Sequence, residues 1–151
     1  MQRLTRLLIG AATFALAAPV LAQFLEGAAK GDWRSFARAG LAWQDLTNPA
    51  LRESLGLRPG ETGIRLTRVS AHGSAGGILK PGDVLLEADG TKLDSTGYYD
   101  HPRYGRMLFA LLFSDGRPPG ETMPVKVLRD GQRLDFELPL RSMRPEKDRL
   151  P

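Results

Sequence analysis

The most informative segment of the sequence lies near the middle of the chain and reads Leu79-Lys80-Pro81-Gly82-Asp83-Val84-Leu85-Leu86-Glu87-Ala88-Asp89-Gly90. Pro81-Gly82 predicts a tight turn, because proline fixes φ and glycine tolerates positive φ. Asp83 closes this turn, and its carboxylate can accept hydrogen bonds from the backbone amides just after it. The apolar run 84–86 predicts a short buried strand, and Asp89-Gly90 predicts a hairpin turn behind it.

Two elements are predicted before this stretch. Residues 48–56 are typical of a short helix, in which Asn48 is the N-cap, Pro49 occupies the first position and Gly56 ends the helix. Residues 63–69 alternate apolar and polar side chains with a period of two, which indicates a half-exposed strand.

More elements are predicted after it. Residues 91–93 read as a short strand, and the segment 94–104, rich in aromatic and turn residues, reads as a long loop. Residues 105–114 are apolar almost all round, which favours a helix with one face on the core and another open to a ligand. The chain then closes with a hairpin of strands 124–129 and 133–138, joined by Asp130-Gly131.

The order of these motifs resembles the PDZ domain of the HtrA/Deg proteases, the plant Deg type in particular. The resemblance covers residues 36–140 and rests on Gly73-Ser74-Ala75, on the central stretch and on the closing hairpin. It implies an α+β fold, a PDZ-like small antiparallel β-barrel or sandwich of five to six strands capped by two or three short helices. It does not include a protease domain, so the hydrolysis of the family is not implied.

The same resemblance implies a peptide-binding site. Ala39, Gly40 and Leu41 stand where such a domain has its carboxylate-binding loop, whose backbone N–H groups face a peptide C-terminus. A plain glycine bulge before a strand is the alternative reading of Gly40. The walls of the peptide groove would be Ala42, Trp43, Leu108, Leu111 and Leu112.

These residues predict a module that captures an extended peptide or protein C-terminus. The peptide would add as a strand to residues 41–45, beside the helix expected at 105–114. Its partner would be a periplasmic protease or another envelope protein, which the module recruits or regulates. The alternative is a structural or regulatory subunit of a separate complex, with the groove already occupied.

The composition argues against several other classes of function. The chain has 151 residues, enough for one domain with a proper core, and no cysteine, which excludes disulfides and thiolate chemistry. Two histidines leave little scope for a metal site, and no cofactor is expected. The net charge of +4 includes Arg3 and Arg6, which belong to a segment expected to be removed. No basic cluster is interleaved with aromatics, so no nucleic-acid partner is expected.

The two ends of the chain are expected to lie outside the domain. Residues 1–22 are typical of a secretory signal peptide, with two arginines, an apolar core too short to span a bilayer comfortably, and cleavage after Ala22. An uncleaved anchor is the alternative. Residues 23–35 read as a flexible lead-in and 141–151 as a disordered tail. The location would be periplasmic or secreted, without a stable membrane span after cleavage.

Ser74 and His72 invite a hydrolase reading that the pattern does not support. The segment 73–77, Gly-Ser-Ala-Gly-Gly, does not have the spacing of a nucleophile elbow. Adjacency in sequence also does not orient His72 as a base. Ser74 is instead expected to cap a short helix over 75–79. His101 could act as a ligand, or as a base together with Asp100. A structural loop held in place by its tyrosine side chains is the favoured interpretation.

Overall fold

The computed structural model describes residues 25, 29, 37–114 and 117–142. The predicted signal peptide and most of the predicted lead-in and tail lie outside the described residues. The chain divides into two compact units, residues 1–34 and 35–151, and every described strand belongs to the second. In the part of the chain that the structure describes, no helix is long and apolar enough to cross a membrane.

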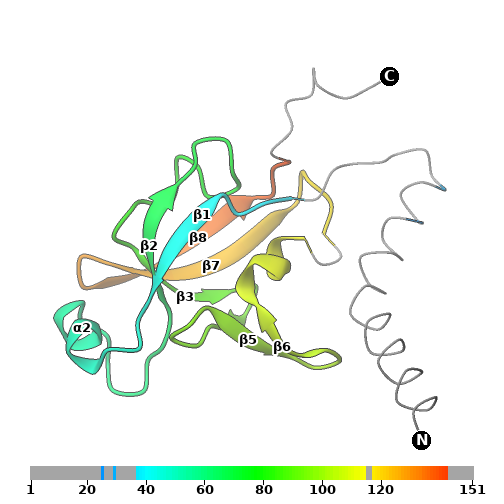
Figure 1. Ribbon diagram of the computed structural model, residues 1–151. Helices are drawn as coiled ribbons and strands as arrows, with labels where there is room; N and C mark the ends of the chain where they lie inside the picture. The colour runs from blue at the N-terminus through cyan, green and yellow to red at the C-terminus, as the bar shows by residue number, and fades with distance from the viewer. Residues whose placement is uncertain (1–24, 26–28, 30–36, 115–116, 143–151) are drawn as a thin grey trace, which may run out of the picture. The chain divides into compact units, whose positions relative to one another are not determined.

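The second unit is mostly antiparallel β-sheet with few helices, as expected for a PDZ-like domain (Figure 1). The described residues form eight strands, more than the five or six expected, because two of them lie where a loop and a helix were predicted. The strands are β1 (Leu41–Asp45), β2 (Ile64–Val69), β3 (Val84–Ala88), β4 (Thr91–Lys92), β5 (Tyr98–His101), β6 (Gly105–Leu108), β7 (Thr122–Arg129) and β8 (Gln132–Pro139). The helices are α2 (Pro49–Ser54) and the 3-10 helix η1 (Phe109–Phe113).

Six strands form one sheet, in the order β1-β2-β3-β7-β8 with β4 beside β3, and β5 and β6 form a separate two-stranded sheet. No closed barrel is formed by the described strands, since β1 and β8 end the path. The two margins approach each other at one corner, where Ala37 bridges Ser142 and the Arg38 amide donates to the Arg141 carbonyl at 3.1 Å. Thus the ordered contacts reach Ser142, two residues into the segment predicted as a tail.

The turns predicted from the central stretch are confirmed. Asp89 (φ 52°) and Gly90 (φ 71°) connect β3 to β4. The turn predicted for the closing hairpin is similar, since Asp130 (φ 50°) and Gly131 (φ 76°) connect β7 to β8. The role of Asp83 differs in detail: its carboxylate accepts from the amide of Lys80, before it in the chain, at 2.8 Å. The Asp83 carboxylate, which follows the Pro81-Gly82 turn, therefore closes it by bonding to the residue that precedes the turn.

Helix α2 forms as the sequence predicted. The Asn48 side chain accepts from the Ala50 amide at 3.0 Å, Pro49 stands in the first turn, and Gly56 takes a positive φ after the helix. Leu51 and Leu55 pack against a small apolar cluster beneath the helix. The larger core lies on the other face of the sheet and gathers residues from β2, β3, β7, β8 and η1.

The helix predicted over 105–114 is wrong, and so is the loop over 94–104. Residues 98–101 and 105–108 pair as the hairpin β5–β6, and only residues 109–113 wind into the 3-10 helix η1. The first residue of β6, Gly105, has φ 73°, and its last residue, Leu108, is extended. The backbone is therefore not helical at either end of this strand. A short apolar run does not by itself distinguish strand from helix, and here pairing with β5 decides.

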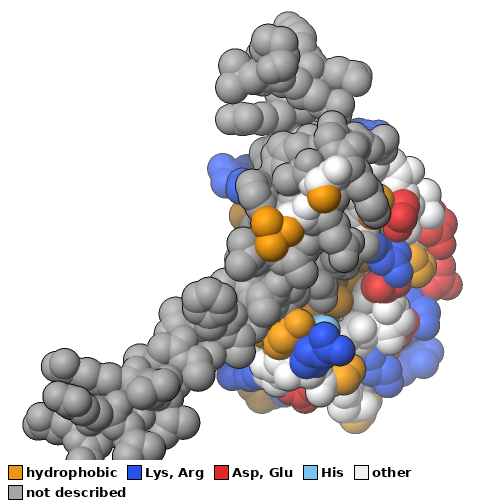
Figure 2. Space-filling view, turned by 90° about the vertical axis from the view of Figure 1, so that its right-hand side faces the viewer, with side chains coloured by type: hydrophobic (Ala, Val, Ile, Leu, Met, Phe, Trp, Pro, Cys, Tyr) orange, Lys and Arg blue, Asp and Glu red, His pale blue; other side chains and the backbone are white. Residues whose placement is uncertain are grey.

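The surface is charged and mixed. Figure 2 shows acidic and basic side chains lying side by side, with small hydrophobic patches between them. Two of the ion pairs differ sharply in burial. Asp83 is 2% exposed and receives Arg129 through bonds of 2.7 Å to each carboxylate oxygen, whereas the pair of Arg133 with Glu61 is partly open to solvent.

Replacement of Arg129 by alanine should destabilise the fold strongly. It leaves the buried carboxylate of Asp83 without its charged partner, which typically costs about 3 kcal/mol or more of unfolding free energy. Urea unfolding followed by circular dichroism measures the loss. Arg133→Ala is the matched control and should lower the midpoint much less. Equal losses in the two variants would contradict the importance of burial.

Candidate functional site

The segment Ala39-Gly40-Leu41 turns sharply just as β1 begins. Gly40 has φ 70°, and a Cβ added to it would lie 2.8 Å from the Cα of Gly73 and 3.2 Å from the Cβ of Ser70. Both the backbone conformation and the space therefore require glycine at this position. The segment is held against the chain at 70–75 by backbone contact.

Three consecutive carbonyl groups of this segment point toward the chain at 70–75. The bonds are Ser74 N–H to the Arg38 carbonyl at 3.0 Å, Ala75 N–H to the Ala39 carbonyl at 3.3 Å, and Ser70 N–H to the Gly40 carbonyl at 2.8 Å. In a trans peptide the N–H points opposite to the carbonyl that precedes it, and no described peptide bond is cis. The amides of residues 39, 40 and 41 are therefore directed away from the 70–75 segment.

Ser74 fixes this arrangement with its side chain. Its hydroxyl is fully buried, donates to the Arg38 carbonyl at 3.0 Å and accepts from the Arg141 amide at 2.9 Å. The expectation that Ser74 caps a helix is wrong, because residues 75–79 form turns and the hydroxyl bonds elsewhere. His72 is exposed, whereas Ser74 is buried between backbone groups, so the two are not arranged as a nucleophile and base.

Strand β1 is an edge strand, paired with β2 on one side and ending the order of the sheet. Leu41 and Trp43 are half-buried and pack against the main core, whereas Ala42 alternates to the opposite face. The Trp43 and Phe109 rings pack nearly perpendicular to each other with centroids 4.9 Å apart, which links β1 to η1. The outer edge of β1 carries the backbone groups that a further strand would need.

The predicted groove residues are distributed over two elements rather than one helix. Leu108 ends β6, and Leu111 and Leu112 belong to η1. Leu108 and Leu112 pack against the same core as Leu41 and Trp43. Leu111 is half-buried outside that cluster. Of the five residues predicted for the groove walls, Trp43, Leu108 and Leu112 thus pack against one core, and Ala42 and Leu111 do not belong to it.

A turn that the sequence reading treated as loop holds η1 in place. Asp94 accepts from the Thr96 amide and hydroxyl at 2.8 Å each and from the Tyr98 amide at 2.9 Å. The turn presents the Gly97 carbonyl, which accepts from the Phe109 amide at 2.9 Å, at the start of η1. A Cβ at Gly97 would lie 3.1 Å from the Trp43 indole nitrogen. The Asp-Ser-Thr-Gly sequence was the available signal for this turn.

The bonding at Asp94 also shifts its ionisation. Burial alone would raise the pKa of Asp94, but hydrogen bonds from the Tyr98 amide, from Thr96 and from Arg106 outweigh burial and lower the pKa to about 2. The charged form is therefore the one that the turn stabilises. The carboxylate also receives Arg106 at 2.9 Å, which ties β6 to the same turn.

Comparisons with known proteins identify relatives of this chain. The chain is 31% identical over 125 residues to Do-like 13 of Arabidopsis thaliana and 26% identical over 133 residues to the mitochondrial Do-like 11 of the same plant, both named as candidate proteases. These matches cover 82% and 87% of this chain but only 25% and 24% of the relatives. Its homologues are Deg/HtrA-type proteases. No protein-family model matches the chain.

Solved structures of HtrA-type proteases share the fold. The protease AlgW with tripeptide aligns with a TM-score of 0.57 and 26% identity, over 84% of this chain and 38% of that chain. AlgW with decapeptide aligns with a TM-score of 0.53 and 31% identity, over 84% and 35%. The resemblance to the PDZ part of HtrA/Deg proteases is thereby confirmed. The chain spans about a quarter of the length of its curated relatives.

The Asp94 turn predicts a pH dependence. Because the folded-state pKa of about 2 lies below the ordinary value of 3.8, the stabilising contribution of Asp94 is fully present above pH 3.8 and is lost as the pH falls through 2. The difference in unfolding midpoint between the native chain and Asp94→Asn should therefore shrink over this range. Asp100→Asn, on the exposed side of the same hairpin, is the control. A difference that stays constant with pH would contradict the assignment.

Proposed function

We propose that residues 36–140 form an exported PDZ-like module that captures the C-terminus of an extended peptide or protein by strand addition. The observation that carries the proposal is the set of three consecutive amides at 39–41, directed away from the 70–75 segment at the start of an edge strand. Successive backbone N–H groups of this kind make anion-binding sites, and a peptide C-terminus is such an anion. None of these three amides donates to a carbonyl of the 70–75 segment.

The peptide would run antiparallel to β1 from this loop. Its backbone would pair with the outer edge of β1 and extend the sheet by one strand. The terminal carboxylate would receive the amides of Ala39, Gly40 and Leu41. Since affinity from main-chain pairing depends little on sequence, the side chains must supply the preference.

The neighbouring side chains favour an apolar C-terminal residue. Leu41 and Trp43 from β1, Leu108 from β6 and Leu112 from η1 pack against one apolar cluster, and Leu111 is the neighbour of Leu112 on η1. An apolar terminal side chain would add to this cluster and be removed from water. Ala42 would face the other side of the added strand.

The module would recruit or regulate a partner, such as a protease or another envelope protein. The relatives are named for protease activity, but the matched segment is a part of about 130 residues of each of them, which is consistent with a segment that does not itself hydrolyse peptides. Signal-directed export to the periplasm or outside remains part of the proposal. A subunit whose groove is occupied by another segment is the alternative, and it predicts no binding of free peptides.

Removal of the peptide carboxylate should weaken binding strongly. A fluorescent peptide with an apolar C-terminal residue and a free carboxylate is titrated with the folded module, and its amidated twin serves as the comparison. Loss of the charge removes the partner of three amides, and we expect at least about a tenfold weaker affinity. Equal binding of the two peptides would favour internal strand addition, and absence of binding to both would favour the occupied subunit.

Gly40→Ala should give the same selective loss from the side of the protein. The added Cβ would lie 2.8 Å from the Gly73 backbone, so the loop must shift. Gly77→Ala is the matched control, because Gly77 also has a positive φ (81°) but nothing within 4 Å of the added Cβ. Both variants carry the same kind of backbone strain, and only the first should lose discrimination between the free and the amidated peptide.

The apolar wall can be tested at Leu111, which is outside the core cluster. Leu111→Ser should weaken binding of a peptide ending in an apolar residue by about tenfold, since much of the transfer free energy of a leucine side chain is lost. Leu55→Ser, beside α2, is the control for a lost half-buried leucine. Unfolding midpoints of both variants separate binding from stability. Equal affinities in the two variants would remove Leu111 from the site.

A further inference from the structure

The outer face of β1 and β2 carries two arginines that the proposed peptide would meet. Gln44 lies directly opposite Arg65, and Ala42 lies directly opposite Arg68. Directly opposed residues of two strands share a face of the sheet. A register shift between residues 42 and 43 accommodates the extra residue Thr67 on β2, so that Arg68 keeps to the outer face.

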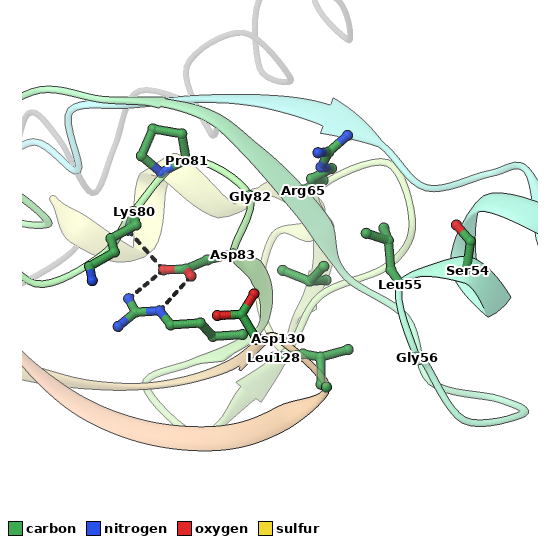
Figure 3. Close-up of a pocket in the computed structure, with 13 residues that line it drawn as sticks. Ser54, Leu55, Gly56, Arg65, Lys80, Pro81, Gly82, Asp83, Leu128 and Asp130 are labelled. Carbon is green, nitrogen blue, oxygen red and sulfur yellow. Dashed lines mark hydrogen bonds and ion pairs between the residues drawn. The ribbon is translucent and has the colours of Figure 1, made fainter.

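Neither arginine is neutralised within the described residues. Arg65 is half-buried and Arg68 exposed, and neither forms an ion pair or a side-chain hydrogen bond with another described residue. Figure 3 shows the Arg65 side chain beside β1 and directed away from the Asp83–Arg129 pair. Arg65 also lines a cavity of about 510 Å³ together with Lys80, whose ammonium likewise has no described acidic partner.

Other charges on this face of the sheet lie beside charges of opposite sign. Lys126 and Glu87 form an ion pair at 3.0 Å. Charges of alternating sign continue across the strands, since Lys92 lies opposite Glu87 and Asp135 lies opposite Lys126. The acid nearest to the arginines in sequence is Glu61, which is paired with Arg133. On the neighbouring strand, Asp45 alternates to the other face of β1. In the cavity, Asp83 is taken by Arg129, and Asp130 is the acid that remains.

The register of an added strand determines which of its side chains meet the arginines. With the terminal carboxylate at the amides of 39–41, the last residue faces the apolar cluster beside Leu41, and alternation places the penultimate residue outward beside Ala42. The fourth residue from the end then lies outward beside Gln44. Both outward positions are two strand spacings, roughly 10 Å, from β2. The small side chain of Ala42 leaves the space through which Arg68 can reach the added strand.

We propose that this face selects peptides with acidic side chains at the penultimate position and at the fourth position from the C-terminus. Arg68 would pair with the first of these and Arg65 with the second. The inference rests on the proposed capture of a C-terminus by β1, and it adds a charge preference to that site. Because both guanidinium groups are partly or fully in water, each contact should be modest and sensitive to salt.

The test uses three labelled peptides that end in the same apolar residue. The parent carries alanine at the two outward positions, the second peptide carries glutamate and the third lysine at both. At low salt the glutamate peptide should bind roughly fivefold more tightly than the parent, and the lysine peptide more weakly. The difference should decrease as the salt concentration rises.

Variants then assign the preference to residues. In Arg65→Ala/Arg68→Ala, the glutamate and lysine peptides should bind alike, while the affinity for the parent stays within about twofold, because the parent places no charge outward. Arg58→Ala, which removes the same charge from another part of the surface, should keep the preference. Equal binding of the three peptides to the native chain, or a preference that survives in the double variant, would overturn the inference while leaving the capture of C-termini intact. Failure of the parent peptide to bind would overturn both.

Discussion

The close approach of two backbones at Gly40 and Gly73 is the constraint on which the proposed site depends. A Cβ on Gly73 would lie 2.6 Å from the Ala39 carbonyl oxygen and 2.7 Å from the Gly40 Cα. A side chain therefore fits at neither Gly40 nor Gly73. This proximity lets the 70–75 segment take the carbonyls of residues 38–40 as acceptors. The amides of residues 39–41 are then directed away from the 70–75 segment, because the N–H and the C=O of one trans peptide group point in opposite directions.

Local signals explain which parts of the fold could be predicted. The turns at Asp89-Gly90 and Asp130-Gly131 depend on two residues each, and the helix at 49–54 depends on its own cap. Such features are set by a few neighbours in sequence, so the sequence contains the whole argument. The family resemblance then supplied the mostly antiparallel architecture, which local patterns do not contain.

The errors occurred where a distant partner decides. Residues 105–108 became a strand because β5 pairs with them, and Ser74 became a backbone clamp because Arg38 and Arg141 lie on either side of it. An apolar stretch and a serine after glycine carry no sign of these partners. For the candidate site, the residue types on β1 could be predicted. The contact of Trp43 with η1, and the Asp94 turn that holds η1 in place, could be seen only in the structure.

The corner where Ala37 bridges Ser142 has a mechanical meaning. The chain enters the domain at Ala37 and leaves it at Ser142, and these two residues pair with each other. Tension applied through both flanking segments would therefore load this bridge and the adjacent Arg38–Arg141 hydrogen bond before any strand of the sheet. Neighbouring ends also make the domain easy to place within another chain, because an insertion that enters and leaves at one point requires little separation in the host. The hydroxyl of Ser74 accepts from Arg141 at the same corner, so a pull on the ends would act early on the loop that carries the proposed carboxylate site.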